Sequence, residues 1–359
     1  MASSISIETF EVPQTLEGPD GDLFREMVAL RNRVARDVLG AVADDTVPEE
    51  IHPYLLDQEH DRNIARIARE DGKLVGVAEI FWAVDPESKV TWGEINVVPE
   101  YRGRGIGSRL LEEVEAFARE LGRPILQGGA YHQQVDGPRL DSPTGYGSLP
   151  REEQAVRFLA NRGFTLEQVY RYSRLPLPVD PAVIDPLYEA ALAKAGPDYR
   201  IVTWMRRVPE QWLDGVATIF MRMATDAPAG NLEIDEEKWD ADRVRKNDEK
   251  RLASGRTQLV AAVEHVPTGS LVAFNGVTLS EDRSRPVHQG ITLVLKEHRG
   301  HRLGTIVKIA NIHQLAAFSP GSPCILTDNA EENRPMLDVN EAVGFQPVGY
   351  EGVWKKILT

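Results

Sequence analysis

A turn rich in glycine lies at residues 103–107, where the chain passes from an expected strand into an expected helix. The strand spans residues 94–98, and glycine occupies positions 103, 105 and 107. The helix is predicted from apolar residues at three-to-four spacing, namely Leu110, Leu111, Val114, Phe117, Ala118 and Leu121. Unpaired N–H groups at a helix N-terminus suit a phosphate, and glycine lets a ligand approach the backbone closely. The turn therefore indicates a phosphate or pyrophosphate site, with a tight connection that binds nothing as the alternative.

Two common nucleotide-binding motifs do not fit this turn. No Gly-Lys-Ser/Thr follows it, as a P-loop requires. The dinucleotide spacing G-x-G-x-x-G is also incomplete. A ligand of the turn therefore belongs to neither of these two binding classes.

The chain repeats its own pattern. Residues 73–80 and 270–277 both alternate as strands do, with Leu74 and Leu271 separated by 271 − 74 = 197 positions. The same offset places residues 97–103 on 294–300. Near the ends of the copies the offset falls to 344 − 163 = 181, where Gly-Phe recurs. An insertion in the first copy, in a loop at about residues 132–150, explains the fall.

The repeat predicts two domains of one mixed α/β class, each with a central mixed sheet flanked by helices. We expect the first domain at residues 1–176 and the second at 201–359. The proline-rich segment 177–200, with a helix at 182–195, is predicted to link them. Each copy follows the order strand, helix, antiparallel strands, glycine turn, helix, strand, helix, strand.

Composition narrows the function classes. The formal net charge of −14 disfavours nucleic-acid binding and would attract a cationic small substrate. The single cysteine, Cys324, fits a reducing compartment, and the N-terminus lacks a signal-peptide pattern. We therefore expect a cytoplasmic protein that does not enter a membrane, and a homo-oligomer is compatible with the sequence.

The motif Arg102-x-x-Gly105-x-Gly107 follows a strand that ends in Val-x-Pro, and a helix with Gly163-Phe164 closes the copy. This arrangement resembles the acyl-CoA signature of the GCN5-related N-acetyltransferase (GNAT) superfamily. The duplicated layout is similar to the tandem members of that superfamily. The resemblance covers roughly residues 1–175 and 200–359.

The resemblance implies that acetyl-CoA is the co-substrate and that no metal takes part. The amides at 104–107 would hold the pyrophosphate, the strand before them would pair with the pantetheine arm, and the amide near Val98 would polarise the thioester carbonyl. The residues expected to contact the cofactor are Val97, Val98, Arg102, Gly103, Arg104, Gly105, Ile106, Gly107 and Ser108 in the first copy, and Arg299, Gly300, Gly304 and Asn333 in the second.

The two copies have diverged at this signature. Arg302 stands in the second copy where the first has Gly105, so its side chain would obstruct a ligand unless it points to solvent or contacts a phosphate. The family often has Asn eleven residues before the Gly of Gly-Phe, and the second copy keeps it as Asn333 whereas the first has Glu152. We favour the first copy as the catalytic one, because phosphate contact depends on small residues.

An amine acceptor must lose a proton before it attacks a thioester. Glu94 lies where the family often places its base, although an ordinary sheet residue is the alternative. The tyrosine that many relatives use as an acid is replaced by Leu159 and Asn340. Tyr146, in the inserted loop, could substitute for it. That loop, with His132, Asp136 and Asp141, is also a candidate specificity lid.

We therefore expect acetyl transfer from acetyl-CoA to a primary amine of a small molecule by direct attack. A longer acyl donor is an alternative, because the pyrophosphate is common to all acyl-CoA molecules. A CoA-binding or partner-binding module without chemistry is another. His298 and His301 bracket the second turn, and their spacing without carboxylate or cysteine partners makes a poor metal site.

Overall fold

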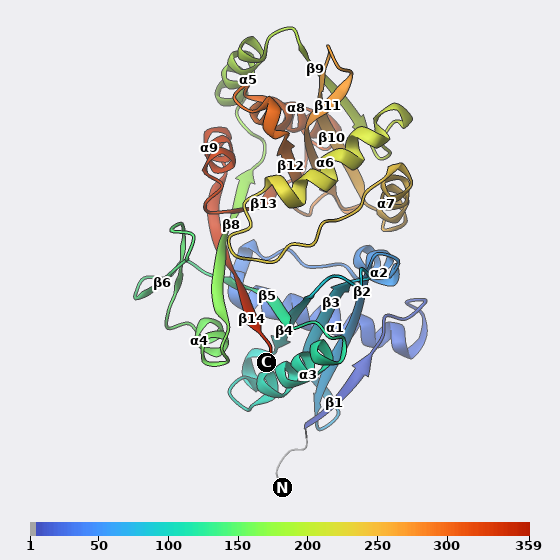
Figure 1. The fold of residues 1–359 in the computed structure, drawn as a ribbon, viewed down its shortest axis with the longest axis vertical. Helices are drawn as coiled ribbons and strands as arrows, with labels where there is room; N and C mark the ends of the chain where they lie inside the picture. Colours follow the sequence, from blue (N-terminus) through green and yellow to red (C-terminus); the bar gives the residue numbers. More distant parts are fainter. Residues whose placement is uncertain (1–4) are drawn as a thin grey trace. The chain divides into compact units, whose positions relative to one another are not determined.

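The computed structural model describes residues 5–359, which form two compact units (Figure 1). The first unit runs to Tyr170 and includes Ala229–Asp235 and Val348–Thr359. The second comprises Arg171–Pro228 and Glu236–Pro347. The domain boundaries at residues 176 and 201 stay a prediction from the repeat, and the compact units differ from them because Ala229–Asp235 and Val348–Thr359 belong to the first unit.

The first unit is a sheet with helices on both faces. Its strands follow the spatial order β1-β2-β3-β4-β5-β14, and the first half of β8 lies next to β14. The elements are β1 (Ile5–Phe10), α1 (Gly18–Leu39), α2 (Pro48–Leu56), β2 (Asp61–Glu70), β3 (Lys73–Ala83), β4 (Val90–Val97), α3 (Ile106–Glu120), β5 (Ile125–His132), β6 (Arg139–Asp141), β7 (Ser148–Pro150), α4 (Gln154–Asn161), β8 (Thr165–Pro176) and β14 (Gln346–Ile357).

Strand β3 shows which helix covers which face of this sheet. A Cβ atom on Gly76 would lie 3.0 Å from Leu110 of α3, so the residues in phase with Gly76 face α3. Because side chains alternate along a strand, Glu79 points to the opposite face, where it contacts Arg31 of α1. The face toward α1 thus carries the Glu79 carboxylate and the Arg31 guanidinium group.

Strands β4 and β5 separate next to the glycine turn. They pair in parallel from Val90 with Ile125 to Trp92 with Gln127, and beyond these residues the two strands form no further pair with each other among the described residues. The second unit repeats this feature, because β12 and β13 pair only from Val287 with Ile325 to the next residue of each strand. Both copies therefore open their sheet at the same place.

The second unit has the same order of elements as the first. Its strands run β9-β10-β11-β12-β13, with the second half of β8 beside β13. The elements are α5 (Pro181–Ala195), β9 (Tyr199–Met205), α6 (Leu213–Asp226), α7 (Ala241–Ala253), β10 (Thr257–His265), β11 (Ser270–Leu279), β12 (Val287–Val294), α8 (Leu303–Phe318), β13 (Cys324–Ala330) and α9 (Arg334–Val343). The mixed α/β class that we expected, with a central mixed sheet flanked by helices, is confirmed.

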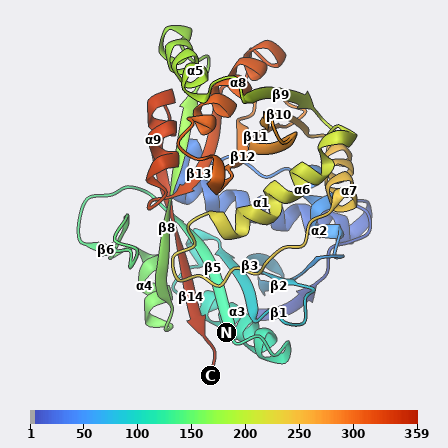
Figure 2. The same ribbon diagram turned by 45° about the horizontal axis from the view of Figure 1, so that its top comes forward.

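Two segments differ from the simple repeat. Strand β14 follows the second copy's Gly344-Phe345, yet it pairs with β5 of the first unit, from Tyr350 with His132 to Ile357 with Ile125. The turned view in Figure 2 shows β14 and β5 along the same sheet. The inserted loop is ordered in part as the hairpin β6–β7, with Arg139 opposite Pro150.

None of the helices in residues 5–359 has both the length and the apolar character needed to cross a membrane.

Replacing Trp354 of β14 with Ala should lower the free energy of unfolding by about 3–5 kcal/mol, because a large core side chain is lost. Its indole is 1 % exposed in the core of the first unit. Ile357 of the same strand is 58 % exposed, so Ile357→Ala should change the free energy by no more than about 0.5 kcal/mol. Urea unfolding followed by circular dichroism measures both, and equal losses in the two variants would contradict the assignment of β14 to this core.

Candidate functional site

The glycine turn of the first unit leaves its peptide N–H groups open. Gly103 and Gly105 have φ of 76° and 86°, a region that L side chains rarely adopt. A Cβ atom at either position would meet no other atom within 4 Å. The first backbone bond of helix α3 runs from Arg109 N to Gly105 O at 3.1 Å, so the N–H groups of the preceding turn have no intrahelical acceptor. These groups could bind an anion.

The arginine side chains of this turn brace it. Arg102 donates from Nε to Val97 O at 3.0 Å and from Nη1 to Asp37 Oδ2 at 2.8 Å. Arg104 pairs with the buried Glu70 at 3.1 Å. Both residues stay in the predicted cofactor set, but in this structure their guanidinium groups tie the turn to α1 and β2.

The amide near Val98 that could reach a thioester belongs to Val97. Val98 N donates to Val75 O at 3.1 Å, so that N–H is used within the sheet. Peptide groups alternate between the two edges of a strand. The N–H of Val97 therefore points away from β3, toward the gap between β4 and β5.

The remaining predicted residues of the first copy lie on the first turn of α3. Ile106 is 1 % exposed and anchors the helix in the core. Gly107 leaves room beside Phe158 of α4, since an added Cβ would sit 3.7 Å from its ring. The Ser108 hydroxyl accepts a hydrogen bond from Arg162. Only the backbone of these residues faces the open turn.

The second turn has the same backbone. Gly300 has φ of 87°, and Arg302 adopts φ of 57°, the left-handed conformation of Gly105. Arg302 is exposed, so its side chain points to solvent. Arg299 repeats the brace, donating to Val294 O at 3.3 Å and to Asp226 O at 3.2 Å. The substitution at 302 has therefore kept the shape of the turn.

The other residues singled out in the second copy are Gly304, Asn333 and two histidines, and only Gly304 repeats the placement of its counterpart in the first copy. Gly304 lies beside Val294, as Gly107 lies beside Val97. Asn333 precedes α9, but its side chain forms no cap hydrogen bond. His298 Nδ1 lies 3.1 Å from the hydroxyl of Tyr199. The His301 ring packs 5.0 Å from the ring of Tyr199, so both histidines belong to an aromatic cluster.

Glu94 lies in a charged cluster on the α1 face of the first sheet. It stands directly opposite Glu79 in the β3–β4 ladder and accepts a hydrogen bond of 2.8 Å from Asn96. Arg31 of α1 reaches Glu79 with two nitrogens, Nη1 at 3.2 Å from Oε1 and Nε at 2.9 Å from Oε2. Tyr131, at the end of β5, interacts electrostatically with Arg31.

Burial raises the pKa of Glu79 to about 7. The charge of Arg31 acts in the opposite direction, and the neighbouring Glu94 raises the pKa further. A carboxyl group that titrates near neutral pH is suited to accept a proton at physiological pH.

Sequence reasoning missed Glu79 and Arg31. Glu79 was counted only as part of an alternating strand. The available signal was its position: it shares the buried phase of residues 75 and 77, both valine, yet it is charged. Arg31 gave no such signal, because its contact with Glu79 joins residues 48 positions apart.

The predicted acid Tyr146 is placed in the tight turn between β6 and β7. Its side chain is 48 % exposed, and its hydroxyl bonds to no group among residues 5–359. His132, which we expected on a lid, is fully buried at the end of β5 and lies 2.8 Å from Glu153. The tyrosine that shares the charged cluster is Tyr131, so Tyr146 remains a prediction without structural support.

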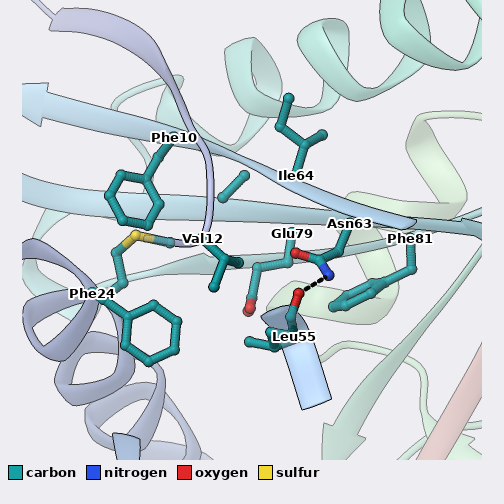
Figure 3. A pocket seen from close by; sticks show the side chains of 10 residues that line it. Phe10, Val12, Phe24, Leu55, Asn63, Ile64, Glu79 and Phe81 are labelled. Carbon is teal, nitrogen blue, oxygen red and sulfur yellow. Dashed lines mark hydrogen bonds between the residues drawn. The ribbon is translucent and has the colours of Figure 1, made fainter. Parts of the chain in front are cut away.

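A small cavity opens beside Glu79. Its volume is about 20 Å³, enough for about one water molecule. Figure 3 shows Glu79 pointing into it among aromatic and aliphatic side chains, with Asn63 bonded to Leu55 O at 2.7 Å. The lining residues are Phe10, Val12, Phe24, Met27, Leu55, Asn63, Ile64, Ala65, Glu79 and Phe81.

The second unit lacks the charged cluster. Asp226 accepts a hydrogen bond from the arginine of the second turn, as Asp37 does from the arginine of the first, and the two aspartates are 226 − 37 = 189 positions apart. The same offset of 189 places Phe220 where the first unit has Arg31. The strand offset of 197 places Gly276 and Ile291 at the positions of the two glutamates. Phe220 packs in an apolar cluster there, 4.7 Å from the Trp239 ring.

Among residues 5–359, no three His, Cys, Asp or Glu side chains are grouped so that they could hold a metal ion.

Comparisons with known proteins agree with this geometry. Residues 29–127 match the model of the acetyltransferase (GNAT) family, a segment that includes Arg31, Glu79, Glu94 and the first turn. A search of curated protein sequences found no match.

Several solved structures share the fold over the whole chain. A tandem GNAT protein from the clavulanic acid biosynthesis pathway is 22 % identical, with a TM-score of 0.75 over 99 % of this chain and 98 % of that chain. A glucosamine N-acetyltransferase region of a fungal multi-domain β-N-acetylglucosaminidase is 14 % identical, with a TM-score of 0.62 over 99 % of this chain and 38 % of that one. A GCN5-related N-acetyltransferase from Sphaerobacter thermophilus is 14 % identical, with a TM-score of 0.58 over 98 % and 95 %. In fold the chain is a tandem GNAT-type protein, with a sequence match to the acetyltransferase family in its first copy.

Proposed function

We propose that the protein is an N-acetyltransferase whose first unit moves an acetyl group from acetyl-CoA to a primary amine of a small molecule. The observation that carries the proposal is the combination, within one unit, of an open backbone turn and a carboxylate cluster at the same opening of the sheet. The turn suits the diphosphate of acetyl-CoA, and the carboxylate cluster suits an amine acceptor that arrives with a positive charge.

Acetyl-CoA fits the first turn through the main chain. The empty space above Gly103 and Gly105 and the open N–H groups of residues 103–108 would receive the diphosphate. The outward N–H of Val97 would polarise the thioester carbonyl and stabilise the oxyanion that develops there. In this role the acyl donor supplies an activated carbonyl, and the protein supplies its orientation.

The acceptor would meet the donor on the α1 face of the sheet. An amine arrives mostly protonated at neutral pH, and the carboxylates of Glu94 and Glu79 would attract it. Glu94 would take a proton from the ammonium group, after which the neutral amine attacks the thioester carbonyl. Coenzyme A then leaves as a thiol of pKa about 8.5, which needs no strong acid.

The second unit supports a different role. It keeps the turn, the brace and the opened strands, but apolar residues replace the carboxylates and the arginine. We propose that it does not transfer acetyl groups and that its turn, if it binds coenzyme A, does so without chemistry. A longer acyl donor in the first unit would use the same backbone contacts. The cytoplasmic location stays a prediction from the sequence.

Release of free thiol from acetyl-CoA tests the function. The purified protein is assayed with a panel of primary amines, including polyamines, amino acids and aminoglycosides. We expect turnover with at least one cationic amine and none with its N-acetylated form. Tight binding of coenzyme A without turnover on any amine would contradict the enzyme and favour a binding module.

Gly105→Arg should weaken acetyl-CoA binding by at least about tenfold, since a side chain would enter the space above the open amides. Gly122→Arg is the matched control, because Gly122 ends the same helix with φ of 69° and open space around it. Calorimetry should show near wild-type affinity for Gly122→Arg and for Arg302→Ala. Equal affinity of Gly105→Arg and wild type would remove the first turn from the site.

Glu94→Gln should lower kcat/KM by about 100-fold, the usual contribution of a general base. Acetyl-CoA affinity should not change, because no contact joins this side chain to the turn. Glu87→Gln serves as the control, since Glu87 is exposed in the turn between β3 and β4. If Glu94→Gln keeps the wild-type rate, Glu94 is an ordinary sheet residue.

A further inference from the structure

Glu79 and Glu94 form a carboxylate pair built into the ladder between β3 and β4. They are direct partners in the antiparallel register, at a position where the two residues exchange backbone hydrogen bonds. At such a position the two Cα atoms lie about 5.5 Å apart and both side chains leave the same face. Two carboxylates so placed do not ionise independently, and the first proton that the pair takes up is held more tightly than an isolated carboxylate would hold it.

The surroundings assign that proton to Glu79. Glu79 is 7 % exposed, whereas Glu94 is only partly buried and bonds to the amide of Asn96. Burial raises the pKa of Glu79 to about 7 in spite of the Arg31 charge beside it. The groups that face it and carry charge or titrate are Arg31 from α1 and Glu94 from β4, with Tyr131 of β5 acting on Arg31.

The fold does not require these charges. At the equivalent positions the second unit has Phe220, Gly276 and Ile291, and Phe220 and Ile291 pack in an apolar cluster. Replacing a buried ion pair by apolar residues is often neutral or stabilising. The retention of Arg31 and Glu79 in the first unit therefore needs an explanation other than stability.

The cavity beside Glu79 offers a route for the proton. Its volume of about 20 Å³ accommodates about one water molecule, in contact with the carboxyl group (Figure 3). The other polar side chain in the lining, Asn63, is held by Leu55 O and does not titrate.

We propose that Glu79 is the proton store of the active site: Glu94 meets the ammonium group of the acceptor, and the proton passes from Glu94 to Glu79, which Arg31 holds in place. This inference rests on the proposed acetyl transfer. It assigns roles to two residues, Glu79 and Arg31, that lie outside the turn and behind the residue that touches the acceptor.

The step balances in protons and electrons. An N–H bond of the ammonium group breaks, its electron pair stays on nitrogen, and the proton is held by Glu79 as a neutral carboxylic acid. The amine then forms a C–N bond with the acetyl carbon while the C–S bond breaks. The proton on the new amide nitrogen goes to the thiolate, and Glu79 returns its own proton to solvent through the cavity water.

The pH dependence of kcat/KM tests the proposal, measured from about pH 5 to about pH 9 with one acceptor for all variants. In the wild type we expect the rate to fall as the pH drops through about 7, where Glu79 becomes protonated before substrate arrives. This fall in rate is the acidic limb of the pH profile. Glu79→Gln should lack the limb, and its rate at neutral pH should be about 100-fold lower than that of the wild type. Arg31→Gln should move the limb to higher pH, because removing the positive charge raises the pKa of Glu79 further.

Glu264→Gln is the matched control. Glu264 is 7 % exposed and pairs with Arg200 at 2.8 Å on the sheet of the second unit, so this variant also loses a buried, arginine-bound carboxylate. Its pH profile should stay that of the wild type. If Glu79 has a merely structural role, Glu79→Gln should lower the rate without moving the limb.

Difference infrared spectroscopy gives a readout that needs no turnover. The free wild type should show a protonated carboxyl band that disappears as the pH rises through about 7 and that is absent from Glu79→Gln. A Glu79→Gln protein that binds acetyl-CoA normally and keeps the wild-type limb would overturn the proposal, even with transferase activity intact. If Glu79→Gln does not fold, an unshifted limb in Arg31→Gln would overturn it. Absence of turnover in the wild type would instead defeat the proposed function, and this inference with it.

Discussion

The site depends on one constraint: the peptide N–H groups at the start of α3 must stay unpaired and point into open space. Two left-handed glycines turn the chain so that these groups face outward, and Arg102 secures the turn by bonding both the end of β4 and Asp37 of α1. The same bonds fix the end of β4, where the N–H of Val97 faces the gap beside β5. One brace thus positions both the open N–H groups of the turn and the N–H of Val97, to which we assign the diphosphate and the thioester carbonyl.

Comparison of the two copies distinguishes the turn conformation, which both keep, from the charged cluster of side chains, which only the first copy has. The second turn keeps its conformation although an arginine has replaced a glycine, because Arg302 accepts the left-handed φ and points outward. The brace survives as Arg299. The charged cluster has no counterpart, since Phe220, Gly276 and Ile291 occupy its positions. The site that we propose for a diphosphate depends on main-chain N–H groups and on the space in front of them, whereas deprotonation of an amine needs particular side chains.

Much of this could be predicted from local patterns. The strands at 73–80 and 270–277, the helix after Gly105 and the repeat itself follow from periodicity over a few residues, and the structure has them as β3, β11 and α3. The pairing of Arg31 with Glu79 could not be predicted, because it depends on how α1 lies across a sheet. The same holds for β14, which pairs with β5 although more than 200 residues separate them. The use of the Val98 amide within the sheet became visible only with the register known.

Titration of selectively glycine-labelled protein with coenzyme A, followed by amide nitrogen and proton chemical shifts, tests the central claim most directly. Coenzyme A should move the Gly103, Gly105 and Gly107 signals, and pantetheine, which has no diphosphate, should leave them in place. The signals of Gly122, at the other end of α3, should not respond to either ligand. Binding of coenzyme A with the three turn glycines unchanged would contradict the account.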